Sequence, residues 1–216
     1  AWAERAREAA GKGFSAIKFD IDNIDPRRFS DPYHIGDRQA GWLSSQQQPL
    51  ATSELDLIVR LAGALREAIG PQVDLALDCH WTYNTRDVIR LATELAPLNL
   101  MWLEDTTPPD NVEALKRVTD NSPVPICSGE NHFTRHGLRD MVTTQAVDII
   151  QPDTPKTGGL LEAKKIADLA DIYYIPFAAH NVSSPIGTLA ACHSCASMRN
   201  FTVLEFHGQD VVWWND

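Results

Sequence analysis

The chain has 216 residues, enough for one substantial hydrophobic core. Hydrophobic residues make up 44% of it and charged residues 22%, as in an ordinary globular domain. The net charge of −10 argues against a nucleic-acid surface, which needs clustered Lys and Arg. The sequence shows neither a signal-peptide pattern nor an apolar run of about 18 residues. We therefore expect a cytoplasmic protein without membrane association.

The first 22 residues predict a helix followed by a strand. Residues 1–10 form an Ala-rich helical pattern that the glycines after it would end. Residues 14–21 alternate in the manner of a strand, which places Lys18 and Asp20 on the same face.

A long polar segment follows, over residues 23–52, rich in Pro, Gly, Ser and Gln. A loop of this length is either disordered or functional, and we expect this one to close over a pocket. After it, Ser53 is the predicted N-cap of an amphipathic helix that Gly70 ends.

From residue 73 onward, strands and helices are predicted to alternate. The strands are expected at residues 73–79, 99–105, 123–129, 147–153, 173–179 and 201–207, and the helices at 86–96, 112–119, 134–143, 160–170 and 184–196. The strands are apolar runs, which is typical of a parallel sheet buried on both faces. Strands that alternate with helices indicate βαβ units.

A polar residue stands near the end of each of the seven predicted strands. These residues are Asp20, Asp78, Glu104, Glu130, Asp153, His180 and Glu205. A doubly wound sheet is the alternative fold, but it gives no reason for a polar residue at every strand end. A TIM-like α/β barrel brings all these ends to one catalytic face, and the length corresponds to about seven of its units. We therefore predict a (β/α)₇β barrel, incomplete because its first strand is missing.

Three of these residues predict a metal site. Asp78, Glu104 and Glu130 end successive strands, and 26 residues separate each from the next. Carboxylate oxygens from consecutive strands suit Mg²⁺, which keeps open positions for water and substrate. The alternative is that each carboxylate is only a helix N-cap or a charge on the barrel rim.

His180 and Asp153 end neighbouring predicted strands and form a candidate catalytic pair. The carboxylate of Asp153 could accept a hydrogen bond from the imidazole, fix its tautomer and raise its basicity. The alternative is a histidine whose ring is bound by main-chain carbonyls of a polar loop.

Other candidates are less specific. His80 follows Asp78 by two residues and would face the same side if the extended backbone continued, as an acid near the metal or as a helix cap. Lys18 either contacts substrate or is a structural charge inside the barrel.

Two further side chains are candidate substrate contacts. Glu205 could accept a hydrogen bond from substrate, or pair with a base on a neighbouring strand. His132 follows Glu130 by two residues, which predicts that it lines the pocket.

Together these motifs resemble the enolase superfamily, in its mandelate racemase-like branch. The matching elements are KFD at Lys18, DCH at Asp78, WLED at Glu104, SGEN at Glu130, QPDTPKTGG at Asp153, AAHN at His180 and LEFH at Glu205. The family joins a (β/α)₇β barrel to an α+β capping domain. The resemblance implies that residues 1–216 are a partial C-terminal barrel domain, without the capping domain and the first barrel strand.

The resemblance also implies roles for the site residues. Asp78, Glu104 and Glu130 would hold Mg²⁺, and Asp153 with His180 would be the general base that removes the proton next to a substrate carboxylate. The bound ion would stabilise the resulting enediolate.

One departure from the branch favours one activity over another. Racemases of this branch carry a Lys-x-Lys pair, whereas Asp20 stands at the second position here, so we count it among the substrate contacts. His80 and the LEFH ending resemble arabinonate-, gluconate- and galactonate-type dehydratases, in which such a histidine protonates the leaving 3-hydroxyl.

The resemblance therefore implies a lyase, a Mg²⁺-dependent hydro-lyase of sugar-acid catabolism that makes a 2-keto-3-deoxy acid. The alternatives are an epimerase, racemase or cycloisomerase on the same scaffold, with Lys18 or His80 as the second catalytic acid/base, or a barrel without turnover. A homo-oligomer with a small-molecule sugar acid as its partner is expected.

Overall fold

A computed structural model describes residues 2–22, 49–208 and 211. The chain divides into two compact units, one of Ala1–Ala114 with Asn121–Ile126, and the other of Leu115–Asp120 with Cys127–Asp216. Most of the predicted closing loop, residues 23–48, lies outside the described residues.

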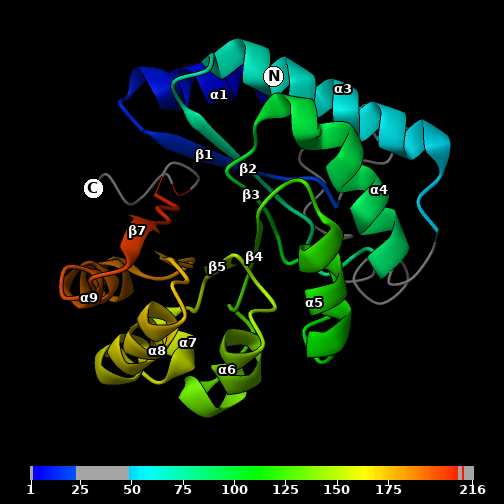
Figure 1. Ribbon diagram of the computed structural model, residues 1–216. Coiled ribbons are helices and arrows are strands. Elements are labelled where there is room, and N and C mark those ends of the chain that lie inside the picture. The colour runs from blue at the N-terminus through cyan, green and yellow to red at the C-terminus, as the bar shows by residue number, and fades with distance from the viewer. Residues whose placement is uncertain (1, 23–48, 209–210, 212–216) are drawn as a thin grey trace. The chain divides into compact units, whose positions relative to one another are not determined.

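Among its described residues, the first unit has strands β1 to β3, with one helix before β1 and the others between the strands (Figure 1). Its elements are α1 (Trp2–Gly11), β1 (Ala16–Asp20), α3 (Thr52–Ile69), β2 (Asp74–Asp78), α4 (Thr85–Leu95), the short 3₁₀ helix η3 (Ala96–Leu98) and β3 (Trp102–Glu104). Strand β2 pairs in parallel with β1 and with β3. Asp78 is the register partner of both Asp20 and Glu104, so three strands end side by side on carboxylates.

Helix α3 forms because its apolar residues recur at helical spacing and bury one face. The buried residues are Leu55, Ile58, Ala62, Leu65 and Ile69. The helix ends at Gly70 as predicted, where φ is +73° and the main-chain N–H donates to the carbonyl of Arg66.

The predicted start of α3 was wrong. Ala51, not Ser53, is the N-cap, and Ser53 lies inside the first turn. The carboxylate of Glu54 reaches back to accept a hydrogen bond from the N–H of Ala51 at 3.4 Å. This contact fixes the start of the helix without a capping side chain on the N-cap residue itself.

The second unit continues the alternation of parallel strands and helices. Its elements are most of α5 (Val112–Asn121), β4 (Ile126–Ser128), α6 (Thr134–Thr143), β5 (Ile149–Ile150), α7 (Thr154–Thr157), α8 (Leu160–Ile172), β6 (Phe177–Ala179), α9 (Pro185–Cys195) and β7 (Phe201–Leu204). Strands β4 to β7 pair in parallel with their chain neighbours. Helix α8 packs against α6 and α9, as Figure 1 shows.

In both units, paired strands follow one another in chain order. A doubly wound sheet would need a reversal of that order, and neither unit contains one among its described strands. Strands β3, β4 and β6 are wholly buried, whereas β1 is half-buried and β7 begins on exposed residues. This arrangement places the polar residues at the carboxyl ends of a parallel sheet.

Candidate active site

A lysine compensates two buried carboxylates at the ends of β2 and β3. Asp78 is 3% exposed and Glu104 is completely buried. Nζ of Lys18, on β1, contacts Oε1 of Glu104 and lies 3.4 Å from Oδ2 of Asp78. The indole N–H of Trp102 donates to the other oxygen of Glu104 at 2.9 Å. The cluster is satisfied because positive charge and an N–H donor replace the water that burial removes.

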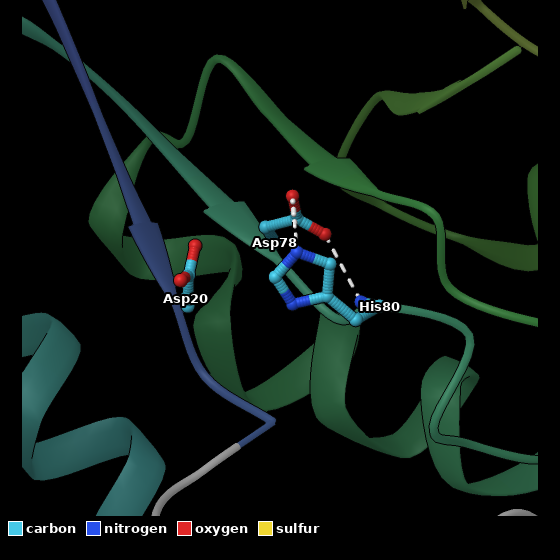
Figure 2. Close-up of side chains that lie close together, drawn as sticks. All are labelled: Asp20, Asp78 and His80. Carbon is cyan, nitrogen blue, oxygen red and sulfur yellow. Dashed lines mark hydrogen bonds and ion pairs between the residues drawn. The ribbon is translucent and has the colours of Figure 1, made fainter. Parts of the chain in front are cut away.

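His80 lies beside Asp78, but not for the predicted reason. The extended backbone does not continue past β2, because φ is +42° at His80 and +58° at Trp81. The resulting turn lets the N–H of His80 donate to Oδ1 of Asp78 at 3.0 Å and brings its Nε2 within 3.4 Å of Oδ2 (Figure 2). His80 thus lies beside Asp78 through a left-handed turn, and the expectation of a continuing extended backbone was wrong.

A carboxylate that the sequence interpretation missed completes the surroundings of His80. Oδ1 of Asp22 lies 3.1 Å from Nδ1 of His80. Burial disfavours the charged imidazole, but Asp22 and Asp78 outweigh burial and raise the pKa of His80 to about 10. Burial also raises the pKa of Asp78, which the charges of Lys18 and His80 oppose. Asp22 lies in a turn beyond the end of β1, so alternation along the strand gave no signal for it.

Side chains of the first unit could hold a metal ion. Asp20, Asp78 and His80 each offer one ligand atom, and these atoms lie within 4.8 Å of one another (Figure 2). Two carboxylates and an imidazole suit a divalent cation. The donor chemistry therefore fits a divalent ion at this end of β1 to β3.

The second unit contains the predicted histidine–carboxylate pair. Nδ1 of His180 lies 2.8 Å from Oδ2 of Asp153, and both residues are buried. Asp153 is the N-cap of α7, where its Oδ1 accepts a hydrogen bond from the N–H of Lys156 at 2.9 Å. One carboxylate oxygen is thus fixed by the helix, and the other faces the imidazole.

Nε2 of His180 faces two further carboxylates. It contacts Oε2 of Glu130 and lies 3.7 Å from Oε2 of Glu205. Burial lowers the tendency of His180 to protonate, but Asp153 and Glu130 outweigh it and raise its pKa to about 9. Lys156, which the sequence interpretation did not single out, lies with Nζ 3.7 Å from Oε1 of Glu130. The structure therefore brings together Glu130, Asp153, His180 and Glu205.

The turn after β4 positions Glu130. Gly129 has φ of +145°, and a Cβ there would lie 3.1 Å from main-chain atoms of Gln151, so this position requires glycine. The N–H of His132 donates to the carbonyl of Gly129 at 3.1 Å. That His132 lines a pocket stays a prediction.

Comparison with known proteins shows the family to which the chain belongs. The family described as "Enolase C-terminal domain-like" matches residues 1–216. The chain belongs to this family. Its members' barrel is the fold class expected from the sequence, and the predicted TIM-like α/β fold is confirmed.

Relatives within the family carry names of sugar-acid enzymes. The chain is 42% identical over 213 residues to a D-xylonate dehydratase of Haloferax volcanii, covering 99% of this chain and 48% of that protein. It is 31% identical to a D-galactarolactone cycloisomerase of Agrobacterium fabrum over 196 residues, 90% of this chain and 50% of that protein.

A crystal structure of a mandelate racemase/muconate lactonizing enzyme-like protein from Rubrobacter xylanophilus has a TM-score of 0.86 to this chain. The two are 43% identical, and the match covers 99% of this chain and 51% of the other. The chain thus spans about half the length of these relatives. Among the described residues, no helix is long and apolar enough to cross a membrane.

Proposed function

We propose that the whole protein is a Mg²⁺-dependent sugar-acid dehydratase, a hydro-lyase, with a five-carbon aldonate such as D-xylonate as its first candidate substrate. The observation that carries the proposal is the 42% identity to a D-xylonate dehydratase along nearly the whole chain. The buried His180–Asp153 pair and the histidine beside Asp78 support it, because elimination needs both a base and an acid.

Asp78, Glu104 and Glu130 are the residues that we propose to hold Mg²⁺. All three are buried carboxylates that already contact cationic or donor groups: Lys18 and Trp102 at Glu104, Lys18 at Asp78, and Asn131 and Lys156 at Glu130. Bound Mg²⁺ would supply positive charge for the substrate carboxylate as negative charge develops on it. Asp20 offers a further ligand atom close to Asp78.

His180 is the proposed general base. Asp153 accepts from Nδ1, so Nε2, which contacts Glu130 in this structure, is the nitrogen that would take the proton from C2 of the substrate. His80 is the proposed general acid that protonates the departing 3-hydroxyl. The carboxylates of Asp22 and Asp78 beside its ring favour the protonated form that an acid needs.

The remaining predicted site residues receive supporting roles. Glu205 and Asp20 are proposed to accept hydrogen bonds from substrate hydroxyls, and His132 to contact substrate. Lys18 is proposed as the charge that holds Asp78 and Glu104 in place, with substrate contact as its second possible role. A cycloisomerase is the alternative activity, and the 31% identity to a D-galactarolactone cycloisomerase supports it.

The test is a substrate screen on the full-length protein. D-xylonate, D-gluconate, D-galactonate, D-mannonate and D-arabinonate are each incubated with Mg²⁺, and 2-keto-3-deoxy acids are detected with semicarbazide. Product from at least one acid, abolished by EDTA, is expected. A keto acid from none of them would overturn the dehydratase proposal, and turnover of D-galactarolactone alone would establish the cycloisomerase.

Variants separate the two histidines. His180→Asn should lose exchange of the C2 proton with D₂O, whereas His80→Asn should keep exchange and lose elimination. His136→Asn is the matched control, because His136 is an exposed histidine of α6 and should retain both activities. If both active-site variants lost exchange equally, the division into base and acid would be wrong.

A further inference from the structure

A fully buried asparagine links the strand that carries His180 to the strand that carries Glu205. Asn181 directly follows His180 and is 0% exposed. Its main-chain N–H donates to Oε2 of Glu205 at 2.9 Å. Its side-chain Nδ2 donates to the main-chain carbonyl of Glu205 at 3.0 Å. Asn181 therefore binds Glu205 at both the carboxylate and the main chain.

Thr188 fixes the side chain of Asn181. Nδ2 of Asn181 also donates to Oγ1 of Thr188 at 2.9 Å. The carbonyl of Glu205 can only accept, so the nitrogen of the amide must face it, and this gives the side chain a single orientation. Thr188 is 8% exposed and lies on α9, whose start is fixed by the N-cap Ser184. The contacts run without a break from α9 through Asn181 to Glu205.

The orientation of Glu205 matters because of where its carboxylate lies. The oxygen that accepts from Asn181, Oε2, is also the oxygen that lies 3.7 Å from Nε2 of His180. Nε2 is the ring nitrogen that does not face Asp153. The side chain of Glu205 is only partly buried, so packing alone does not hold it. If the glutamate side chain changes rotamer, its carboxylate no longer lies at a fixed distance and angle from a reacting group.

We propose that Asn181 and Thr188 are positioning residues that hold the Glu205 carboxylate beside Nε2 of His180. Asn181 is too deeply buried to touch substrate, so its effect on the reaction passes through Glu205. The part of this inference that concerns turnover rests on the proposed dehydratase function, and the part that concerns the carboxylate's position does not. The competing explanation is that Asn181 and Thr188 only join β6, β7 and α9.

A double-mutant cycle on the full-length protein distinguishes these explanations. Thr188→Val removes the hydroxyl while keeping the shape of the side chain, and should lower both kcat and the rate of C2-proton exchange about tenfold, with KM within about twofold. Thr188→Ser keeps the hydroxyl and should restore most of kcat. In a Glu205→Ala background, Thr188→Val should change C2-proton exchange by less than about twofold, because no carboxylate is left to position.

The control is Thr119→Val. Thr119 is a half-buried helical threonine of the same unit, whose hydroxyl donates to the carbonyl of Ala146 at 2.7 Å. It should lose stability without a change in kcat. An equal loss of activity from Thr188→Val with and without the Glu205 side chain would overturn the proposal and leave a structural link.

A crystal structure of Thr188→Val gives a readout that needs no turnover. The Glu205 carboxylate should leave the main-chain N–H of Asn181 or occupy a second rotamer, whereas Thr188→Ser should show it in place. A carboxylate that stays in place in Thr188→Val would refute the positioning role. If the wild-type protein dehydrated no sugar acid, the proposed function would fail, and this structure would still decide the positioning role.

Discussion

Replacement of Lys18 by Met should destabilise the full-length protein most when divalent metal is absent. The substitution keeps the apolar stem but leaves the buried carboxylates of Asp78 and Glu104 without their cation. Breaking a buried ion pair by truncating one partner costs about 3–5 kcal/mol, and we expect about 3 kcal/mol in EDTA. A divalent ion bound to the same carboxylates would replace the lost charge, so the loss should fall to about 1 kcal/mol in saturating Mg²⁺.

The two losses imply a change in metal affinity. Lys18 repels a cation that binds the same carboxylates, and a difference of about 2 kcal/mol corresponds to roughly 30-fold tighter Mg²⁺ binding in Lys18→Met. Urea unfolding with EDTA and with Mg²⁺ measures the losses, and calorimetry measures the affinity. The control is Lys116→Met, whose exposed pair with Asp120 should contribute no more than about 0.5 kcal/mol. Equal losses in both buffers, or an unchanged affinity, would refute the reasoning.

Two further predictions concern the second unit. Gly129→Ala should reduce the free energy of unfolding by roughly 1–3 kcal/mol, because φ is +145° and the new Cβ would press on the main chain of Gln151. Gly63→Ala, in the interior of α3 with open space around it, should instead add about 0.5–1 kcal/mol in the same urea titration. The main-chain N–H of Arg135, and then its guanidinium charge, lower the pKa of the Glu162 carboxyl. This interaction stabilises the fold above the usual carboxyl pKa and is lost as the pH falls through the lowered value. Arg135→Met keeps the N–H bond, so an NMR titration of Glu162 should show its pKa only partly restored, and full restoration would contradict the assignment.

The sequence predicted the order of elements well and their lengths poorly. The predicted strand 147–153 is longer than the observed strand β5, which comprises only Ile149–Ile150. An apolar run indicates which residues are buried, and fewer residues than these form hydrogen bonds to neighbouring strands. The predicted helix 134–143 coincides with α6, whose buried residues Leu138, Met141 and Val142 recur at helical spacing. The strand-end residues were found because each apolar run gives way to a polar residue where a parallel strand ends, although most of these polar residues are themselves buried.

Residues whose positions depend on local turns or buried hydrogen bonds could not be identified from the pattern of apolar and polar residues. The left-handed turn at His80 and Trp81 does not follow from a sequence without glycine. Asn181 looks like any polar residue after a strand, and only its two bonds to Glu205 distinguish it. Thr188 lies in an apolar helix where a threonine suggests packing.

The two histidines proposed as base and acid have surroundings of the same kind, so charge alone does not separate the two roles. His180 lies between Glu130 and Asp153, and His80 between Asp78 and Asp22, so each contacts one proposed metal ligand and one other carboxylate. They differ in exposure.

The side chain of His180 is 6% exposed, with its Nδ1 2.8 Å from Asp153, whereas that of His80 is 22% exposed and stands in a left-handed turn. Removing a proton from carbon needs a fixed approach of the base, which a buried ring held by a helix-capping carboxylate provides. Protonating a hydroxyl that leaves as water tolerates a ring nearer to solvent. Burial, rather than pKa, therefore favours His180 as the base and His80 as the acid.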